Sequence, residues 1–272
     1  MRSIQQQYQG FLNTKSLWKG KLFDLSSFEI PTQKTQDSLP ENFKLPESLV
    51  LGKRAERFFE IAINQDEDYK FLAGNLQIIH EKQTLGEFDF FLKEKASNQI
   101  FHVELVYKFY VYDPDFENEL DCWIGPNRKD SLIRKIKRLK EHQLPLLFRE
   151  ESSDSLKKFQ LNPESIQQKV CFKANLFIPK RFQHQTFLHI NNDCIVGFWI
   201  HSNEFTKAEY GSFQFYSPKK KNWPIEPEQN QTWKNFDEIN SEIEYLFQHK
   251  KAALLWMKKD TQTFERFFVV WW

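Results

Sequence analysis

Two segments with alternating apolar and polar residues carry the side chains best suited to chemistry. Residues 85–92 contain Asp89, and residues 100–111 contain Glu104. Alternation with a period of two predicts a pair of strands, and the polar residues 93–99 between them predict a hairpin connection. If the apolar faces of the two strands coincide, the polar faces coincide as well. A plausible register then places Asp89 opposite Glu104.

Two carboxylates that face each other across neighbouring strands repel. We therefore expect either a proton on one of them or a cation between them. Mg²⁺, or Mn²⁺ in its place, suits such a site because it accepts one or two carboxylates together with water and substrate phosphate. The arrangement is typical of metal-assisted hydrolysis of phosphodiester bonds. Asp89 and Glu104 are therefore the candidate metal ligands. The alternative is a solvated hairpin face with an ordinary Glu–Lys pair.

Three further residues are candidates for the same site. Lys108 shares the face of Glu104, about 13 Å along the strand, and would orient a water or neutralise charge developing on the phosphate. Glu56, on a helix predicted at residues 53–63, would add an outer carboxylate. His102 also shares the face of Glu104 and would serve as an acid or a phosphate contact. A histidine with a purely structural role is the alternative for that position.

A basic helix is predicted after the hairpin. Asn127 suits its N-cap, Asp130 suits the positive end of its dipole, and we expect it to run to about His142 and to end before Pro145. The arc opposite its apolar stripe carries four cations: Arg134, Lys135, Lys137 and Arg138. Such a face suits the phosphate backbone of DNA or RNA. The alternative is a solvated, lysine-rich surface.

Composition narrows the classes of protein. The 38 Lys and Arg residues balance 37 Asp and Glu residues, so any charged partner must be met by a local patch. The length of 272 residues fits one large domain or two small ones, and a 40% hydrophobic content supports a packed core. The three scattered cysteines favour buried thiols over disulfides or a zinc site. No HExxH, P-loop or GxSxG motif is present.

We expect a cytoplasmic protein with no membrane partner. No run approaches the roughly 20 apolar residues of a membrane helix, and the first residues lack the apolar core of a signal peptide. Further strands are predicted at 76–80, 170–178, 194–200, 212–216, 253–257 and 264–271, and a helix at 233–249. A second basic run, residues 219–221, precedes Trp223, a composition that suits single-stranded nucleic acid. The oligomeric state is not set by these features.

Several of these motifs together resemble a bacterial family catalogued as domain of unknown function 1853. The resemblance rests on residues 51–56 (LGKRAE), 84–90 (TLGEFDF), 102–110 (HVELVYKFY), 123–127 (WIGPN) and 176–179 (LFIP). That family is similar in turn to the PD-(D/E)XK nuclease-like superfamily. The resemblance implies an α/β fold with a restriction-endonuclease-like αβββαβ core and a mixed sheet.

The resemblance also implies a division of the chain and a set of site residues. It implies a nuclease-like core at 49–180, preceded at 1–48 by a helical segment and a proline-rich linker and followed at 181–272 by an α+β region packed on the core. Asp89 and Glu104 would be metal ligands, with Glu56 on the first helix. The superfamily pattern has lysine two residues after the glutamate, where this chain has Val106. Lys108 keeps the face but lies about 6–7 Å further on.

These features predict a Mg²⁺-dependent nuclease-like protein that hydrolyses phosphodiester bonds in nucleic acid. The alternative is a catalytically inactive module on the same fold that binds nucleic acid or a protein partner. A purely structural protein with an aromatic interaction surface is a third possibility.

Overall fold

The computed structural model describes residues 2–31 and 38–272, so residues 32–37 of the predicted linker lie outside it. Contacts group the chain into two compact units. The hairpin unit is Ser16–Tyr107 with Arg134–Lys173, and the C-terminal unit is Met1–Lys15, Lys108–Ile133 and Ala174–Trp272. These units do not follow a division at residues 48 and 180, because β5 (Ile100–Tyr112) and β7 (Ile166–Pro179) contribute residues to both.

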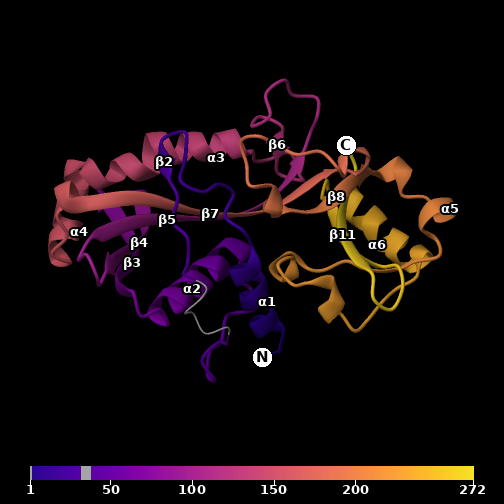
Figure 1. Cartoon of the computed structure of the whole chain (residues 1–272), viewed down its shortest axis with the longest axis horizontal. Coiled ribbons are helices and arrows are strands. Elements are labelled where there is room, and N and C mark those ends of the chain that lie inside the picture. Colours follow the sequence, from indigo (N-terminus) through magenta and orange to yellow (C-terminus); the bar gives the residue numbers. More distant parts are fainter. Residues whose placement is uncertain (1, 32–37) are drawn as a thin grey trace. The chain divides into compact units, whose positions relative to one another are not determined.

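The hairpin unit is a sheet with the strand order β3-β4-β5-β7, covered by helices on both faces. In chain order it contains β1 (Lys21–Leu22), β2 (Leu25–Ser26), α2 (Leu51–Asn64), β3 (Tyr69–His80), β4 (Gln83–Glu94), the first part of β5, most of α3 (Leu132–Arg138), α4 (Ser153–Lys158) and the first part of β7. Figure 1 shows α2 and α3 on opposite sides of strands β3 to β5. Coverage on both sides explains why β5 is buried on both faces.

The apolar stripe of α2 explains its position on the sheet. Ala55, Phe58, Phe59 and Ala62 recur at spacings of three and four residues, and all four are buried. The ring centroid of Phe59 lies 4.4 Å from that of Phe90 on β4. The predicted helix and hairpin are thus confirmed, while β3 begins at Tyr69 rather than at residue 76.

The prediction for the start of the basic helix is wrong. Asn127 caps no helix, and its Oδ1 instead accepts a hydrogen bond from the backbone N–H of Ala252 at 2.8 Å. Arg128 has a φ of 54°, a left-handed conformation that excludes it from a right-handed helix. The α3 helix therefore begins at Leu132.

The end of the basic helix also differs from the prediction. The chain does not stop before Pro145 but continues through a π-helical turn, η1 (Leu139–Gln143), into a 3₁₀ helix, η2 (Leu144–Phe148). Proline is tolerated here because it lies in the first turn of the new helix, where its missing N–H costs no bond. The η2 side chains of Leu146 and Leu147 pack into a core with Phe88 and Phe91 of β4.

The C-terminal unit contains strands paired in the order β5-β7-β8-β11-β10-β9, with β6 paired to β5. Its elements, beside the last parts of β5 and β7, are α1 (Arg2–Asn13), β6 (Trp123–Ile124), β8 (Ile195–His201), α5 (Lys207–Tyr210), β9 (Gln214–Tyr216), α6 (Phe236–Gln248), β10 (Ala253–Lys258) and β11 (Phe264–Val270). β8 runs parallel to β7 and β11, whereas β10 runs antiparallel to both its neighbours. The protein therefore has an α/β fold with a mixed sheet.

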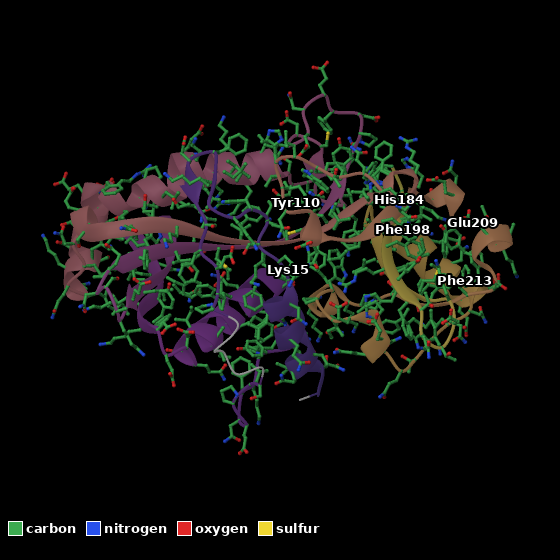
Figure 2. All side chains as sticks on the ribbon, viewed as in Figure 1. Lys15, Tyr110, His184, Phe198, Glu209 and Phe213 are labelled. Carbon is green, nitrogen blue, oxygen red and sulfur yellow. The ribbon has the colours of Figure 1, made fainter. Side chains whose placement is uncertain are left out.

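Aromatic packing dominates the core of the C-terminal unit. The ring of Phe198 stacks on Phe267 of the adjacent strand with 4.8 Å between centroids, and Phe213 packs against the same cluster (Figure 2). The α6 helix begins after Asn235, whose side chain and that of Glu238 form a reciprocal capping box. All three cysteines are buried and unpaired, as predicted. No helix in the described ranges is long and apolar enough to cross a membrane.

Candidate functional site

Strands β4 and β5 stop pairing where two carboxylates face each other. Their antiparallel ladder ends at the pair Phe90–Val103, and one further step of the same register places Asp89 opposite Glu104. In place of a backbone pair, Oδ2 of Asp89 accepts a hydrogen bond from the N–H of Leu105 at 2.9 Å. The side chain of Asp89 thus turns toward the neighbouring strand at the point where the ladder ends.

The two carboxylates lie close enough for the charge of Glu104 to act on Asp89. Glu104 shares a face of the sheet with His102, to which it is bonded, and Phe91 stacks on His102 with 5.2 Å between ring centroids. This face is the one covered by η1 and η2. Asp89 lies where the alternation of β4 is interrupted, because Phe88 packs with Phe91 whereas Phe90 packs on α2.

Burial and like charge act together on Asp89. Burial raises the pKa of Asp89 well above its ordinary value, and the nearby charge of Glu104 raises it further. The hydrogen bond from Leu105 favours the ionised form but does not outweigh these effects. Glu104 itself is 0% exposed. The site therefore holds one fully buried and one half-buried acid, which a cation would stabilise.

Glu104 is held by hydrogen bonds to both of its oxygens. Oε1 lies 3.0 Å from Nε2 of His102, and Oε2 accepts from the side-chain amide of Gln143 on η1. The carbonyl oxygen of that amide accepts in turn from Nζ of Lys135 at 2.7 Å. The carboxylate of Glu104 is thus fixed in one orientation. The side chain of Gln143 links it to the ammonium group of Lys135.

The surroundings of His102 determine its tautomer. The amide nitrogen of Gln168 on β7 donates to the carbonyl oxygen of Leu144 at 2.7 Å, which fixes the orientation of that amide. The same nitrogen lies 3.1 Å from Nδ1 of His102. Since an amide NH₂ can only donate, Nδ1 must accept, and the ring proton lies on Nε2 facing Glu104. The imidazole is therefore a neutral donor that orients the carboxylate.

A second acidic pair lies beside the first. Nζ of Lys53, on α2, is 2.8 Å from Glu56 and 2.9 Å from Glu87. Asn75, with its amide oriented to donate, bonds both carboxylates at 2.8 and 3.1 Å. Burial raises the pKa of Glu56, an effect that Lys53 reduces and the charge of Glu87 reinforces. The charge of Glu56 also contributes to the raised pKa of Asp89, so the two acidic pairs interact.

Lys108 is not brought into this network. It belongs to the C-terminal unit, where its ammonium group forms an ion pair with Asp130. Among the cations of the hairpin unit, Lys53 contacts Glu56 and Glu87, the charge of Lys135 acts on Asp89, and that of Arg57 acts on Glu56. Spacing along β5 contains no information about the aspartate that binds Lys108.

The four basic residues assigned to α3 divide into two groups. Arg134, Lys137 and Arg138 are exposed, with Lys137 3.9 Å from Glu141. Lys135 is half-buried and bonds Gln143, so it belongs to the carboxylate network. Sequence reasoning missed Gln143 and Gln168 because isolated glutamines carry no signal, and missed Lys53 because its partners are distant in sequence.

The donor set at Asp89 and Glu104 fits a small hard cation with few protein ligands. No group of three metal-ligating His, Cys, Asp or Glu residues occurs within residues 2–31 and 38–272. Two carboxylates are nevertheless enough for Mg²⁺, which keeps several of its waters and takes the rest of its ligands from substrate. Oδ1 of Asp89 accepts no hydrogen bond from the residues that the structure describes, so it is available to a metal ion.

These features define an α/β protein with a mixed sheet and a carboxylate pair where two of its strands separate. A family model described as "Domain of unknown function (DUF1853)" matches residues 4–270, nearly the whole chain. The chain belongs to that family, as the sequence motifs indicate. No curated protein and no solved structure is significantly similar to it.

Proposed function

We propose that the protein is a Mg²⁺- or Mn²⁺-dependent nuclease-like hydrolase of the PD-(D/E)XK type, acting on phosphodiester bonds in nucleic acid. The observation that carries the proposal is the pair Asp89 and Glu104, which face each other where β4 and β5 separate. Two neighbouring acids, one fully buried and one half-buried, are costly when both are ionised, and the raised pKa of Asp89 reflects this cost. Proteins retain such arrangements most often at functional sites.

Asp89 and Glu104 would hold the metal ion, which when bound supplies charge neutralisation and polarises the phosphodiester. His102 and Gln143 would keep the Glu104 carboxylate in a fixed orientation, so that no reorganisation is needed on binding. Lys53, beside Glu56, would take the role that spacing assigns to Lys108, contacting the substrate phosphate or orienting the attacking water.

The exposed cations of α3 would bind the nucleic acid backbone. Arg134, Lys137 and Arg138 lie on the helix that covers the carboxylate face in the same unit. Contacts of this kind are independent of base sequence and weaken as the salt concentration rises, because the counterions that binding displaces are then released into a more concentrated solution. We therefore expect binding of DNA or RNA with a steep dependence on salt concentration.

Cleavage assays test this function directly. Single- and double-stranded DNA and RNA are incubated with the purified protein in Mg²⁺, in Mn²⁺ and in EDTA. We expect metal-dependent cleavage of at least one substrate, reduced by about 10²–10³-fold in Asp89→Asn, as for other losses of transition-state charge stabilisation. Asp154→Asn is the matched control, because Asp154 is exposed on α4. Cleavage that is equal in both variants would contradict the proposal.

A catalytically inactive module on the same fold is the second candidate function. It is favoured by Glu104, which is 0% exposed and already accepts a hydrogen bond at each oxygen, and by the ion pair that occupies Lys108. This function predicts salt-sensitive nucleic-acid binding that is unchanged by EDTA, with no cleavage in any metal. Gel-shift measurements on the same samples separate the two candidates.

A further inference from the structure

A cavity in the C-terminal unit is lined by lysines that have no carboxylate partner among the residues the structure describes. Its volume is about 800 Å³, within the range of small-molecule sites. Lys219, Lys220 and Lys251 line it, and none forms an ion pair with a residue in the described part of the chain. The carboxylate among the lining residues, Glu242, is already paired with Lys234. The cavity therefore has an excess of positive charge.

The surroundings of Lys220 make its positive charge costly in the absence of an anion. Partial burial lowers the pKa of Lys220, and the positive charge of Lys108 lowers it further. Asp130 opposes this effect, but its carboxylate is engaged by the ammonium group of Lys108. An anion bound in the cavity would relieve the repulsion between these cations, since an opposite charge stabilises the ionised lysine.

Aromatic and apolar side chains form the rest of the cavity. Trp223 is 8% exposed and is held by a hydrogen bond from its Nε1 to the carbonyl oxygen of Pro218 at 3.2 Å. Its ring packs against Phe109 and Phe268, each with 5.2 Å between centroids, so it is a rigid wall. Tyr245, on α6, also lines the cavity and is 62% exposed. An exposed aromatic of this size beside unpaired lysines is a ready stacking surface.

We propose that this cavity binds a nucleotide, with its phosphate on Lys219, Lys220 and Lys251 and its base against Trp223 and Tyr245. A bare inorganic anion would leave the aromatic and apolar walls unused. An uncharged aromatic ligand would leave the three lysines without an anion, although Nζ of Lys220 lies over the Trp223 ring, 5.4 Å from its centroid. A nucleotide combines both chemistries in one molecule of suitable size. The proposal does not depend on the nuclease function, because all of its residues belong to the C-terminal unit.

Fluorescence anisotropy with a methylanthraniloyl-labelled AMP tests the proposal, using the full chain in low salt with EDTA. We expect saturable binding that weakens about tenfold or more in Lys220→Gln/Lys251→Gln, the loss typical of a charge-assisted hydrogen bond. Tyr245→Ala should weaken binding about fivefold, as expected for one stacked base. The matched control is Lys44→Gln/Lys158→Gln, which removes two exposed charges from the hairpin unit.

Competition identifies the ligand chemistry. Unlabelled AMP should displace the probe at concentrations where neither inorganic phosphate nor adenosine does so. Displacement by phosphate as effective as that by AMP would overturn the nucleotide assignment, and so would an undiminished affinity in the Lys220→Gln/Lys251→Gln variant. Failure of the probe to bind the wild type would overturn it as well. Asp89→Asn should bind the probe normally, so the result is independent of the proposed nuclease site.

Discussion

The two charged regions of this protein differ in how their charges are arranged. In the hairpin unit, Glu104 is fully buried and the neighbouring acids are half-buried, and hydrogen bonds from His102, Gln143 and Asn75 fix the orientation of these groups. In the C-terminal unit, the lysines that line an open cavity have no carboxylate partner among the described residues. We propose that the first arrangement binds a cation and that the second binds an anion. Buried charge with fixed geometry and exposed charge without partners therefore indicate different ligands.

The largest effect is expected for Glu104→Ala. This change leaves the Nε2 proton of His102 and the amide of Gln143 buried without an acceptor, and it empties volume in a fully buried position. We expect the free energy of unfolding to fall by about 3 kcal/mol, the range for breaking a buried charged network. Urea denaturation measures the change. A loss below about 1 kcal/mol would show that the network contributes little to stability.

A smaller loss is expected for His102→Ala, which removes one of the two donors to Glu104. A buried carboxylate oxygen without its donor should destabilise the fold by about 2 kcal/mol. His142→Ala is the control, because His142 is exposed in the same unit. Equal denaturation midpoints for the two variants would contradict a role of His102 in holding Glu104. Any nuclease activity should fall more in His102→Ala than stability alone explains, which a purely structural role would not predict.

Asp89→Asn should instead stabilise the protein at neutral pH. The raised pKa of Asp89 means that the folded protein holds this proton more tightly than the unfolded chain, whose aspartate has a pKa of 3.8. Stability therefore falls as the pH rises from about this value through the folded pKa, and asparagine removes the penalty. We expect the melting temperature to rise by about 2–4 °C at pH 7.

The difference between Asp89→Asn and the wild type should vanish below the ordinary pKa of aspartate, where both folded and unfolded chains are protonated. Thermal melts across a pH series, without divalent metal, measure this dependence. If Asp89→Asn is less stable than the wild type at pH 7, the ionised carboxylate of Asp89 stabilises the folded protein. That result would contradict a destabilising pair of acids at Asp89 and Glu104.

The smallest effect is expected for Lys108→Met. Its ion pair with Asp130 is part-exposed, so its loss should leave the free energy of unfolding nearly unchanged. The rate of metal-dependent cleavage should change by less than about twofold. Lys53→Met, which removes the cation bound to Glu56 and Glu87, should lower cleavage by about tenfold. A larger loss of cleavage in Lys108→Met than in Lys53→Met would indicate that Lys108 acts at the site, as its position on the strand predicts.

The sequence predicts the core of this arrangement because strand periodicity encodes which side chains share a face. Alternation over residues 85–92 and 100–111 predicts the two strands and their antiparallel pairing, and the observed ladder ends one residue before the predicted pair Asp89–Glu104. The start of α3 is not predictable in the same way, since asparagine suits both an N-cap and a turn, and Asn127 bonds a residue 125 positions away. Local chemistry does not distinguish these two uses.

The partners of the site residues are also beyond the reach of local patterns. Gln143 and Gln168 approach the carboxylate face from η1 and β7, and only the tertiary fold brings them to Glu104 and His102. Asp130 lies on a loop whose path is set by the left-handed Arg128. Faces of strands follow from spacing, but contacts between distant segments follow from packing.

Isothermal titration calorimetry with Mn²⁺ and Mg²⁺ tests the central claim most directly. The wild type should bind one ion saturably at pH 7, where a metal ion replaces the proton favoured by the raised pKa of Asp89. Asp89→Ala should lose this binding, and Asp154→Ala, altered at an exposed site, should retain it. Binding of neither metal to the folded wild type, or equal binding by Asp89→Ala, would contradict a metal site at the carboxylate pair.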